Sequence, residues 1–564
     1  MQKFNDLVYT RPDMEEHKSQ LRAITRRIEA AACAEDVIAA IEDYAQLQSG
    51  LRTMNTLAHI RHSIDTSDGF YEGEQKFFDE ALPKATPLLL GYYNALLQSP
   101  FRPQIDQRFG AHYLSIIERE AKTLSPKIML DMIRENELGR EYQKLLASCR
   151  VNFHGETLNL TGLRKYLQDP DRALRKEASE AISAFLSSRK KELDGLYDKL
   201  VKLRTRMGKK LGYENYVPLG YLNMSRTYSP EDVASFRSQV AEYLVPVCTE
   251  MHNRQAERIG VDSLKVYDED YQFPQGNAVP LGDKDFMVNA AQKMYRELSP
   301  ETGEFFDFMV KYELMDLTTK PNKRIGGYCT SMPDYQAPFI FSNFNGTDYD
   351  AKVLTHEAGH AFASVCANKA QPLPEYRHAS LEACEIHSMS MEYFTHPWME
   401  LFFGPKADRY RFAHLCSALA HIPYMVCVDE FQTIVYSHPE LTPAQRRAEW
   451  TKLEKIYLPD RDYDGDSFML RGGFWQKQHH IYTRPFYYVD YALASMGAFE
   501  FYGRMQQDRA AAWQDYLTLC RAGGSRPYRE LLSLANLSDP FLPGGVEKAL
   551  SFGVKEMFSG KPVR

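Results

Sequence analysis

The 564-residue sequence is poor in cysteine, and its nine cysteines lie singly, without a Cys-x-x-Cys pair. We therefore expect neither a disulfide framework nor a cysteine-bound metal, and most cysteines should be small buried side chains. No uninterrupted run of about 18 apolar residues is present, so no membrane-spanning helix is predicted. No apolar run follows residues 1–6, so we expect no signal peptide and a cytoplasmic location.

The sequence also lacks a long basic block, and its formal net charge is −7. We therefore expect no nucleic-acid partner, and the composition carries no prediction of oligomeric state. Hydrophobic residues make up 44% and charged residues 25%, which is typical of a folded globular chain. The length exceeds what one core usually fills and favours two or more lobes, with one large helical domain as the alternative.

Strand signals are few, and helical periodicity dominates. In the first sixty residues, apolar side chains recur at spacings near three and four: Leu21, Ile24, Ile28, Val37, Ile41 and Tyr44. The same period recurs over residues 171–211. There Asp169 is predicted to cap a helix, with Pro170 in its first turn. These patterns predict a mainly α-helical fold.

Two short β-structures are predicted. Residues 151–154 and 157–160 alternate about Gly155 as a small hairpin. Residues 324–328 and 338–344 form a second candidate pair, and a strong turn signal, Asn345-Gly346, follows the latter. Residues 271–283 read as a loop. The hairpin also marks the predicted boundary between an N-terminal helical lobe, residues 1–165, and a catalytic lobe, residues 166–564.

The run His356-Glu357-Ala358-Gly359-His360 carries the chemistry. On a helix, a spacing of four places both imidazoles on one face, where both can bind one ion. Glu357 then lies beside the metal as a candidate base for a bound water. The flanking residues are largely apolar: Val353, Leu354, Ala361, Phe362 and Ala363. Burying two histidines and a glutamate in such a helix is costly unless a metal pairs with them.

A catalytic zinc usually has three protein ligands, which leaves one position for water. Residues 380–394 downstream have the pattern of a second helix, with acidic residues on one face. Glu382, Glu385 and His387 are all physical candidates for the third ligand. Residue types alone do not choose among them, and without the upstream motif this acidic face reads as a solvated one.

The histidine motif, followed after 24 intervening residues by Glu385-Ile386-His387-Ser388-Met389-Ser390-Met391-Glu392, resembles the thimet oligopeptidase and oligoendopeptidase F family. In that family a glutamate, a serine three residues on and a glutamate seven residues on share the second helix. The resemblance selects Glu385 as the third ligand, and it implies that Glu392 supports the site or packs the helix. It also implies two helical lobes around a deep channel, with a small sheet beside the metal.

A second resemblance lies in residues 474–492, which contain a His…Pro-Phe-Tyr…Tyr segment similar to that of the oligoendopeptidase F group. In that group the histidine and tyrosines approach the scissile carbonyl. The order of residues favours His480, with His479 as the alternative. Tyr488 and Tyr491 are one helical turn apart and are the candidate tyrosines, whereas Tyr487 is expected to point elsewhere.

The resemblance implies that residues 338–344 form a sheet edge along which an extended peptide adds as a strand, with Gly326 and Gly327 allowing close approach. From sequence alone an ordinary core hairpin is an equally good interpretation. The implied partners are short peptides.

The predicted activity is a zinc metalloendopeptidase with one Zn²⁺, in which Glu357 is the general base for a metal-bound water. His480, Tyr488 and Tyr491 would assist at the carbonyl oxygen. Cobalt or manganese is an alternative ion. Arg471 and Arg484 keep a dipeptidyl carboxypeptidase of similar fold open, because such an enzyme needs a basic pocket. A non-catalytic zinc- or peptide-binding protein is the third alternative, although it would have no use for Glu357.

Overall fold

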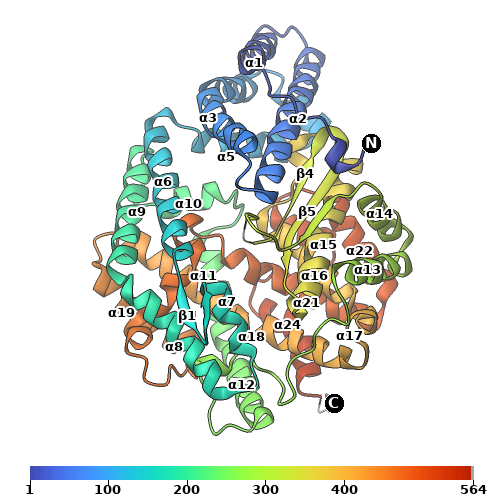
Figure 1. Ribbon diagram of the computed structural model, residues 1–564. Coiled ribbons are helices and arrows are strands. Elements are labelled where there is room, and N and C mark those ends of the chain that lie inside the picture. The colour runs from blue at the N-terminus through green and yellow to red at the C-terminus, as the bar shows by residue number, and fades with distance from the viewer. Residues whose placement is uncertain (325, 560–564) are drawn as a thin grey trace. The chain divides into compact units, whose positions relative to one another are not determined.

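The computed structural model describes residues 1–324 and 326–559, and it is 73% helical (Figure 1). The prediction of a mainly α-helical fold is confirmed. Contacts divide the chain into two compact units. The first contains Met1–Leu124, Val279–Ala407 and Gly497–Ser538, and the second contains Ser125–Ala278, Asp408–Met496 and Asp539–Arg564. The lobe boundary expected at residue 165 stays a prediction.

The first unit contains most of the N-terminal helices and the larger sheet. Its helices are α1 (Met14–Glu29), α2 (Ala34–Ile64), α3 (Gly69–Gln98), α4 (Arg102–Phe109), α5 (Ala111–Thr123), α13 (Lys284–Leu298), α14 (Pro300–Lys311), α15 (Asp348–Ala370), α16 (Leu381–Phe394), α17 (Glu400–Phe403), α22 (Arg509–Ala522) and α23 (Tyr528–Leu534). The apolar residues predicted on the first two helices are all buried in one core with α3, α4 and α5. The helical prediction for the first sixty residues is therefore confirmed.

Three strands form the sheet of the first unit, in the order β3 (Met315–Thr318), β5 (Ala337–Phe344) and β4 (Tyr328–Met332). Strand β5 pairs in parallel with β3 and antiparallel with β4. The strand expected at residues 338–344 is confirmed, but its assignment to the sheet edge is wrong, because β5 lies between two neighbours. Strand β4 lies at an edge of the sheet and contacts α15, as β5 does.

The strand expected at residues 324–328 has the wrong bounds, since pairing begins at Tyr328 and continues to Met332. Ile325 lies outside the described residues. The buried ammonium group of Lys323 explains the late start. It donates to the backbone oxygens of Asp316 and Thr318 on β3 and of Ser342 on β5, and these bonds hold the segment before β4 across the end of the sheet.

The second unit is also helical and carries a small hairpin. Its helices are α6 (Met129–Ala147), α7 (Leu160–Lys165), α8 (Arg172–Ser188), α9 (Lys190–Lys210), α10 (Val217–Asn223), α11 (Pro230–Gln239), α12 (Val245–Ile259), α18 (Ala407–Ser437), α19 (Pro443–Tyr457), α20 (His479–Thr483), α21 (Val489–Gln507) and α24 (Gly545–Met557); the first residue of α18 and the C-terminal half of α21 belong to the first unit. The hairpin joins β1 (Val151–Phe153) to β2 (Glu156–Leu158). Its turn residues His154 and Gly155 both have positive φ. The predicted hairpin is confirmed, but the second strand ends at Leu158 rather than at residue 160, because α7 begins at Leu160.

The periodic segment 171–211 forms two helices, α8 and α9, that meet at Arg189. The expected cap is wrong by two residues. Asp171 caps α8 by accepting from the Ala173 N–H, whereas Asp169 accepts from the Asp171 N–H just outside the helix. The loop expected at residues 271–283 contains no helix or strand.

Two further expectations concern cysteines and membranes. All nine cysteines lie in the described residues as free thiols, and five are buried, as expected. By length and composition alone, one stretch of described residues, Glu400–Ser437, is apolar enough to cross a membrane. Because 72% of its apolar window is buried inside the protein, this stretch is weak evidence for a span.

Candidate functional site

Helix α15 carries the histidine motif, and its entry is fixed by local hydrogen bonds. The Asn345-Gly346 turn follows β5, and the Asp350 carboxylate accepts from both backbone N–H groups of that turn. This bond pattern ties the first turn of the helix to the end of the strand. His356 and His360 then lie one turn apart on the same face, as their spacing predicts.

Gly359 lets the second helix of the site approach α15 closely. A Cβ at this position would lie 2.7 Å from Ser388 Cα and 2.8 Å from the His387 oxygen, both on α16. These separations are shorter than van der Waals contact, so only glycine fits without moving a helix. The close packing brings Glu385 of α16 next to the two histidines.

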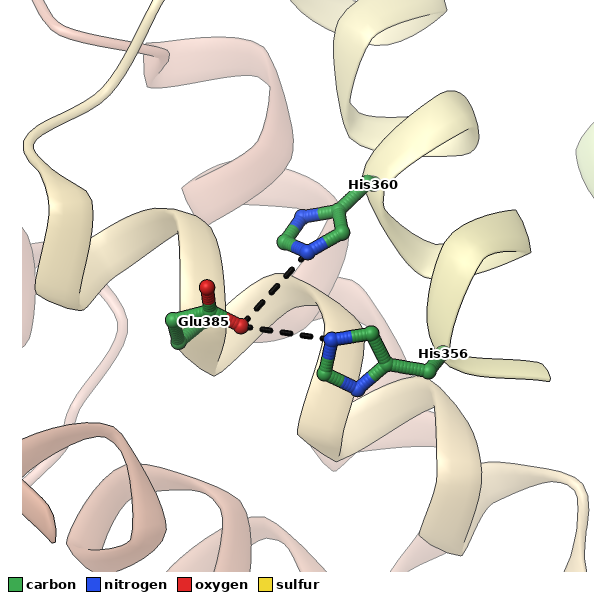
Figure 2. Close-up of side chains that lie close together, drawn as sticks. All are labelled: His356, His360 and Glu385. Carbon is green, nitrogen blue, oxygen red and sulfur yellow. Dashed lines mark ion pairs between the residues drawn. The ribbon is translucent and has the colours of Figure 1, made fainter. Parts of the chain in front are cut away.

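The ligand atoms of His356, His360 and Glu385 all lie within 4.8 Å of one another (Figure 2). Glu385 Oε2 is 3.3 Å from His356 Nε2 and 3.5 Å from His360 Nε2. Two imidazole nitrogens and one carboxylate oxygen that converge on one small volume match the donor set of a catalytic zinc site. The residues therefore fit a zinc ion.

Two neighbours on α16 orient these side chains. Glu392 Oε1 lies 2.6 Å from His356 Nδ1. This pair leaves Nε2, the nitrogen that faces Glu385, as the lone-pair donor of a neutral ring. The Ser388 hydroxyl donates to Glu385 Oε2 at 3.0 Å and holds the carboxylate in place. Both residues act at the spacing from Glu385 that the family resemblance indicated.

The charges of this cluster perturb one another strongly. Burial lowers the pKa of His356, but the hydrogen bonds that its ring donates to the Glu385 and Glu392 carboxylates outweigh burial and raise that pKa well above its ordinary value. Burial raises the pKa of Glu385, yet the two histidines hold it well below its usual range. Without an ion, the cluster thus holds an ion pair between His356 and the neighbouring carboxylates, in which a bound cation can replace the proton of His356.

Glu357 lies beside the three converging residues and is 7% exposed. Burial raises the pKa of its carboxyl, and the positive histidines offset this effect only in part. Among the described residues its Oε2 atom has no hydrogen-bond partner. A Cβ at Gly327, next to the edge strand β4, would be 3.6 Å from its other oxygen. A buried carboxylate with an unused oxygen can accept a proton from a water that shares the site.

The two other candidate ligands lie elsewhere on α16. His387 is buried, and its ring faces Tyr516 of α22 at a centroid distance of 6.4 Å. Burial lowers the pKa of His387 to about 3, with a further contribution from His360. Glu382 is buried one turn before Glu385. Among the described residues, neither belongs to the group of converging ligand atoms.

The second predicted cluster lies in the second unit. The ring of His480 is 5.6 Å from that of Tyr487, 4.9 Å from that of Tyr488 and 6.3 Å from that of Tyr491. The expectation that Tyr487 points elsewhere is wrong, since its hydroxyl lies 3.1 Å from that of Tyr491. His479 is exposed, at the first position of α20. The structure therefore groups His480 with all three tyrosines.

The segment that carries these tyrosines turns at Phe486, whose φ of 68° is strained for an aromatic residue. The Phe486 N–H donates to Gln432 Oε1 at 3.1 Å, and the Arg226 guanidinium donates to the Phe486 oxygen. Arg226 also donates to the buried carboxylate of Asp490 at 2.8 Å. A Cβ at Gly220 would meet the Phe486 ring at 2.5 Å, so glycine makes room for it. These four residues fix the turn, and sequence analysis did not find them.

Helix α18 contributes two further residues that sequence analysis missed. His421 Nε2 lies 2.7 Å from the Tyr488 hydroxyl, and the Tyr424 hydroxyl donates to Gln478 at 3.0 Å. Both are more than fifty residues from their partners in sequence. A histidine and a tyrosine on an apolar helix give no signal of their own, because their partners become visible only in the fold.

Family models match most of the chain. The peptidase family M3 model matches residues 165–549, and the peptidase M3 N-terminal domain model matches residues 4–124. The chain belongs to peptidase family M3. The resemblance seen in the sequence is therefore confirmed.

Similar proteins agree with the assignment of this chain to peptidase family M3. The solved structure of Pz peptidase A with an inhibitor is 47% identical, covers 100% of both chains and has a TM-score of 0.95. The oligoendopeptidase F homolog of Borreliella burgdorferi is 24% identical over 46% of this chain and 46% of its own length, less than half of that relative. Oligopeptidase PepF of Bacillus subtilis is 20% identical over 95% of this chain and 81% of its own length.

Proposed function

We propose that this protein is a zinc-dependent endopeptidase that hydrolyses short oligopeptides. The observation that carries the proposal is the convergence of His356, His360 and Glu385 beside the buried, partly unsatisfied carboxylate of Glu357. Family membership supports peptide hydrolysis, and the relatives named above are described as oligopeptidases and oligoendopeptidases. The substrate channel between two lobes and the cytoplasmic location remain part of the proposal.

His356, His360 and Glu385 would hold the zinc. When bound, the ion would supply a Lewis acid that lowers the pKa of a water and polarises the substrate carbonyl. Three protein ligands leave a coordination position open, as catalytic sites require. Glu392 and Ser388 keep the ligands oriented before the ion arrives.

Glu357 acts as the general base and then as the general acid. Its carboxylate takes a proton from the attacking water and delivers it to the leaving nitrogen of the peptide bond. The raised pKa of this buried carboxyl favours both steps, because a stronger base holds the proton until the amine departs. In the second cluster, His480 and the hydroxyl of Tyr488 or Tyr491 donate to the negatively charged carbonyl oxygen.

The decisive experiment uses an internally quenched fluorescent peptide with a capped C-terminus and the full-length protein. We expect cleavage that a chelator abolishes and that zinc restores. A Glu357→Gln variant should keep one zinc per chain and lose at least about 1000-fold in kcat, because the base is gone but no ligand has changed. Full activity in the chelated protein or in the variant would refute the mechanism.

Two matched variants separate the candidate ligands on α16. Glu385→Gln should lose zinc, whereas Glu382→Gln, one turn away and equally buried, should retain it. Metal analysis of the purified proteins measures the zinc content of both variants and also identifies the native ion. Cleavage only of peptides with a free C-terminus would instead favour a dipeptidyl carboxypeptidase. Stoichiometric zinc without any cleavage would favour a binding protein.

A further inference from the structure

A chain of polar side chains ends on His480 in the second unit. The Tyr424 hydroxyl donates to Gln478 Oε1 at 3.0 Å, and Gln478 Nε2 lies 2.6 Å from His480 Nδ1. Tyr424 lies on α18, Gln478 immediately precedes α20, and His480 is the second residue of α20. Tyr424 is 5% exposed, and the other two are half-buried. The arrangement therefore links a core hydroxyl to one particular nitrogen of the imidazole.

The direction of these bonds determines where the proton of His480 lies. The nitrogen of a carboxamide can only donate hydrogen bonds, so His480 Nδ1 must accept the bond from Gln478 Nε2. A neutral imidazole that accepts at Nδ1 carries its proton on Nε2. Tyr424 sets the orientation of the amide, because its hydroxyl gives Oε1 a donor. Burial raises the pKa of Tyr424 well above its ordinary value, and the hydroxyl therefore keeps its proton.

We propose that Gln478, oriented by Tyr424, is a positioning residue that holds His480 as the Nε2–H tautomer. The consequence for catalysis rests on the proposed function, in which His480 donates a hydrogen bond to the negatively charged carbonyl oxygen. Only a ring nitrogen that carries hydrogen can donate, so the opposite tautomer would present a lone pair to that oxygen. The tautomer itself does not depend on the reaction.

Four aromatic rings also lie beside His480. They are those of His479, at a centroid distance of 3.7 Å, and of the tyrosines at 487, 488 and 491. The Arg484 guanidinium lies over the ring of Tyr487, one of these neighbours. Exchanging the Gln478 amide for a carboxylate reverses the hydrogen bond to His480 Nδ1 with almost no change of shape.

Nitrogen NMR of the full chain with ¹⁵N-labelled histidine tests the tautomer directly. The signals of His480 are assigned by their loss in a His480→Gln variant. We expect a protonated Nε2 and an unprotonated Nδ1 in the wild type. In Gln478→Glu the carboxylate can only accept, so Nδ1 should become protonated. A wild-type His480 with its proton on Nδ1 would overturn the inference, whatever the activity.

Kinetics then test the positioning role. At a pH high enough for the His480 ring of the variant to be neutral, Gln478→Glu should lower kcat roughly 100-fold with KM changed less than about twofold, since one oxyanion donor is lost. In a His480→Gln background the same change should cost nothing further. Tyr424→Phe should produce a mixture of tautomers. Tyr482→Phe, which removes a buried hydroxyl from the same helix α20, should leave His480 unchanged.

The outcomes separate this inference from the proposed function. If Gln478→Glu switches the tautomer but turns over peptide as fast as the wild type, the positioning role is wrong. If its effect persists undiminished in the His480→Gln background, Gln478 acts through another residue and the inference also fails. If the wild type cleaves no peptide at all, the proposed function fails, while the NMR result still decides the tautomer.

Discussion

Replacing Gly359 by alanine should loosen the metal centre without touching a ligand. The added Cβ would lie 2.7 Å from Ser388 Cα, 2.8 Å from the His387 oxygen and 2.9 Å from Met391 Cβ. Carbon atoms in contact prefer about 3.5 Å or more, so α15 and α16 must separate locally by about 0.8 Å. Two of the three atoms met are backbone atoms, which cannot rotate away. The strain must therefore move a helix.

The separation acts on the ligand set, because Glu385 lies on the displaced helix and both histidines lie on the other. Bonds to zinc tolerate changes of about 0.2 Å, which is well below the predicted displacement. We expect zinc affinity to fall about 10- to 100-fold, comparable to the loss of a residue that orients a ligand. The metal-free protein should also lose about 1–3 kcal/mol of stability through overpacking.

A zinc titration against a competing fluorescent chelator measures the affinity, and thermal unfolding of the metal-free protein measures the stability. The matched control is Gly73→Ala in α3, where a Cβ meets nothing within 4 Å. That variant should bind zinc normally and gain about 0.5–1 kcal/mol, the usual benefit of alanine in a helix. Unchanged zinc affinity in Gly359→Ala would refute the idea that this close packing sets the ligand geometry.

Three further perturbations test other contacts. Glu392→Ala removes the partner of His356 Nδ1 and should weaken zinc binding about 10- to 100-fold, measured by the same titration, while saturating zinc restores much of the activity. Gly220→Ala places a Cβ 2.5 Å from the Phe486 ring and should lower kcat with full zinc content; a normal kcat would show that this turn does not position the tyrosines. Burial lowers the pKa of His252, but the carboxylate paired with it outweighs burial and raises that pKa. Its stabilisation should be complete below about pH 6.5 and vanish as pH rises through the folded pKa, and His252→Gln should abolish that slope in unfolding experiments.

The two histidines of the proposed metal site were predictable because their geometry is local. A spacing of four on one helix places His356 and His360 together whatever the rest of the chain does. The third ligand was a different problem, since Glu382, Glu385 and His387 all lie within two turns of α16. Packing against α15 determines which of them faces the histidines, and only the family resemblance supplied that information from the sequence.

The sheet shows what a local pattern leaves out. Residues 338–344 read correctly as a strand, because an apolar run of that length favours β-structure. Its place in the middle of the sheet depends on β3, a strand of four residues that carries no clear alternation. The bounds of β4 depend on Lys323, whose buried ammonium binds backbone oxygens of β3. Neither the central place of β5 nor the bounds of β4 can be deduced from the residues of that strand alone.

The two candidate clusters, the one around His356 and the one around His480, both depend on a glycine. At Gly359 the absent side chain admits the backbone of α16, and at Gly220 it admits the ring of Phe486. Neither glycine has positive φ, so neither is required by its own backbone conformation. Each is required by what packs against it, and sequence analysis overlooked both for that reason. A helical glycine near a candidate motif is therefore worth replacing by alanine. Such a residue has no reactive side chain, but the close packing that it allows can position the residues of the motif.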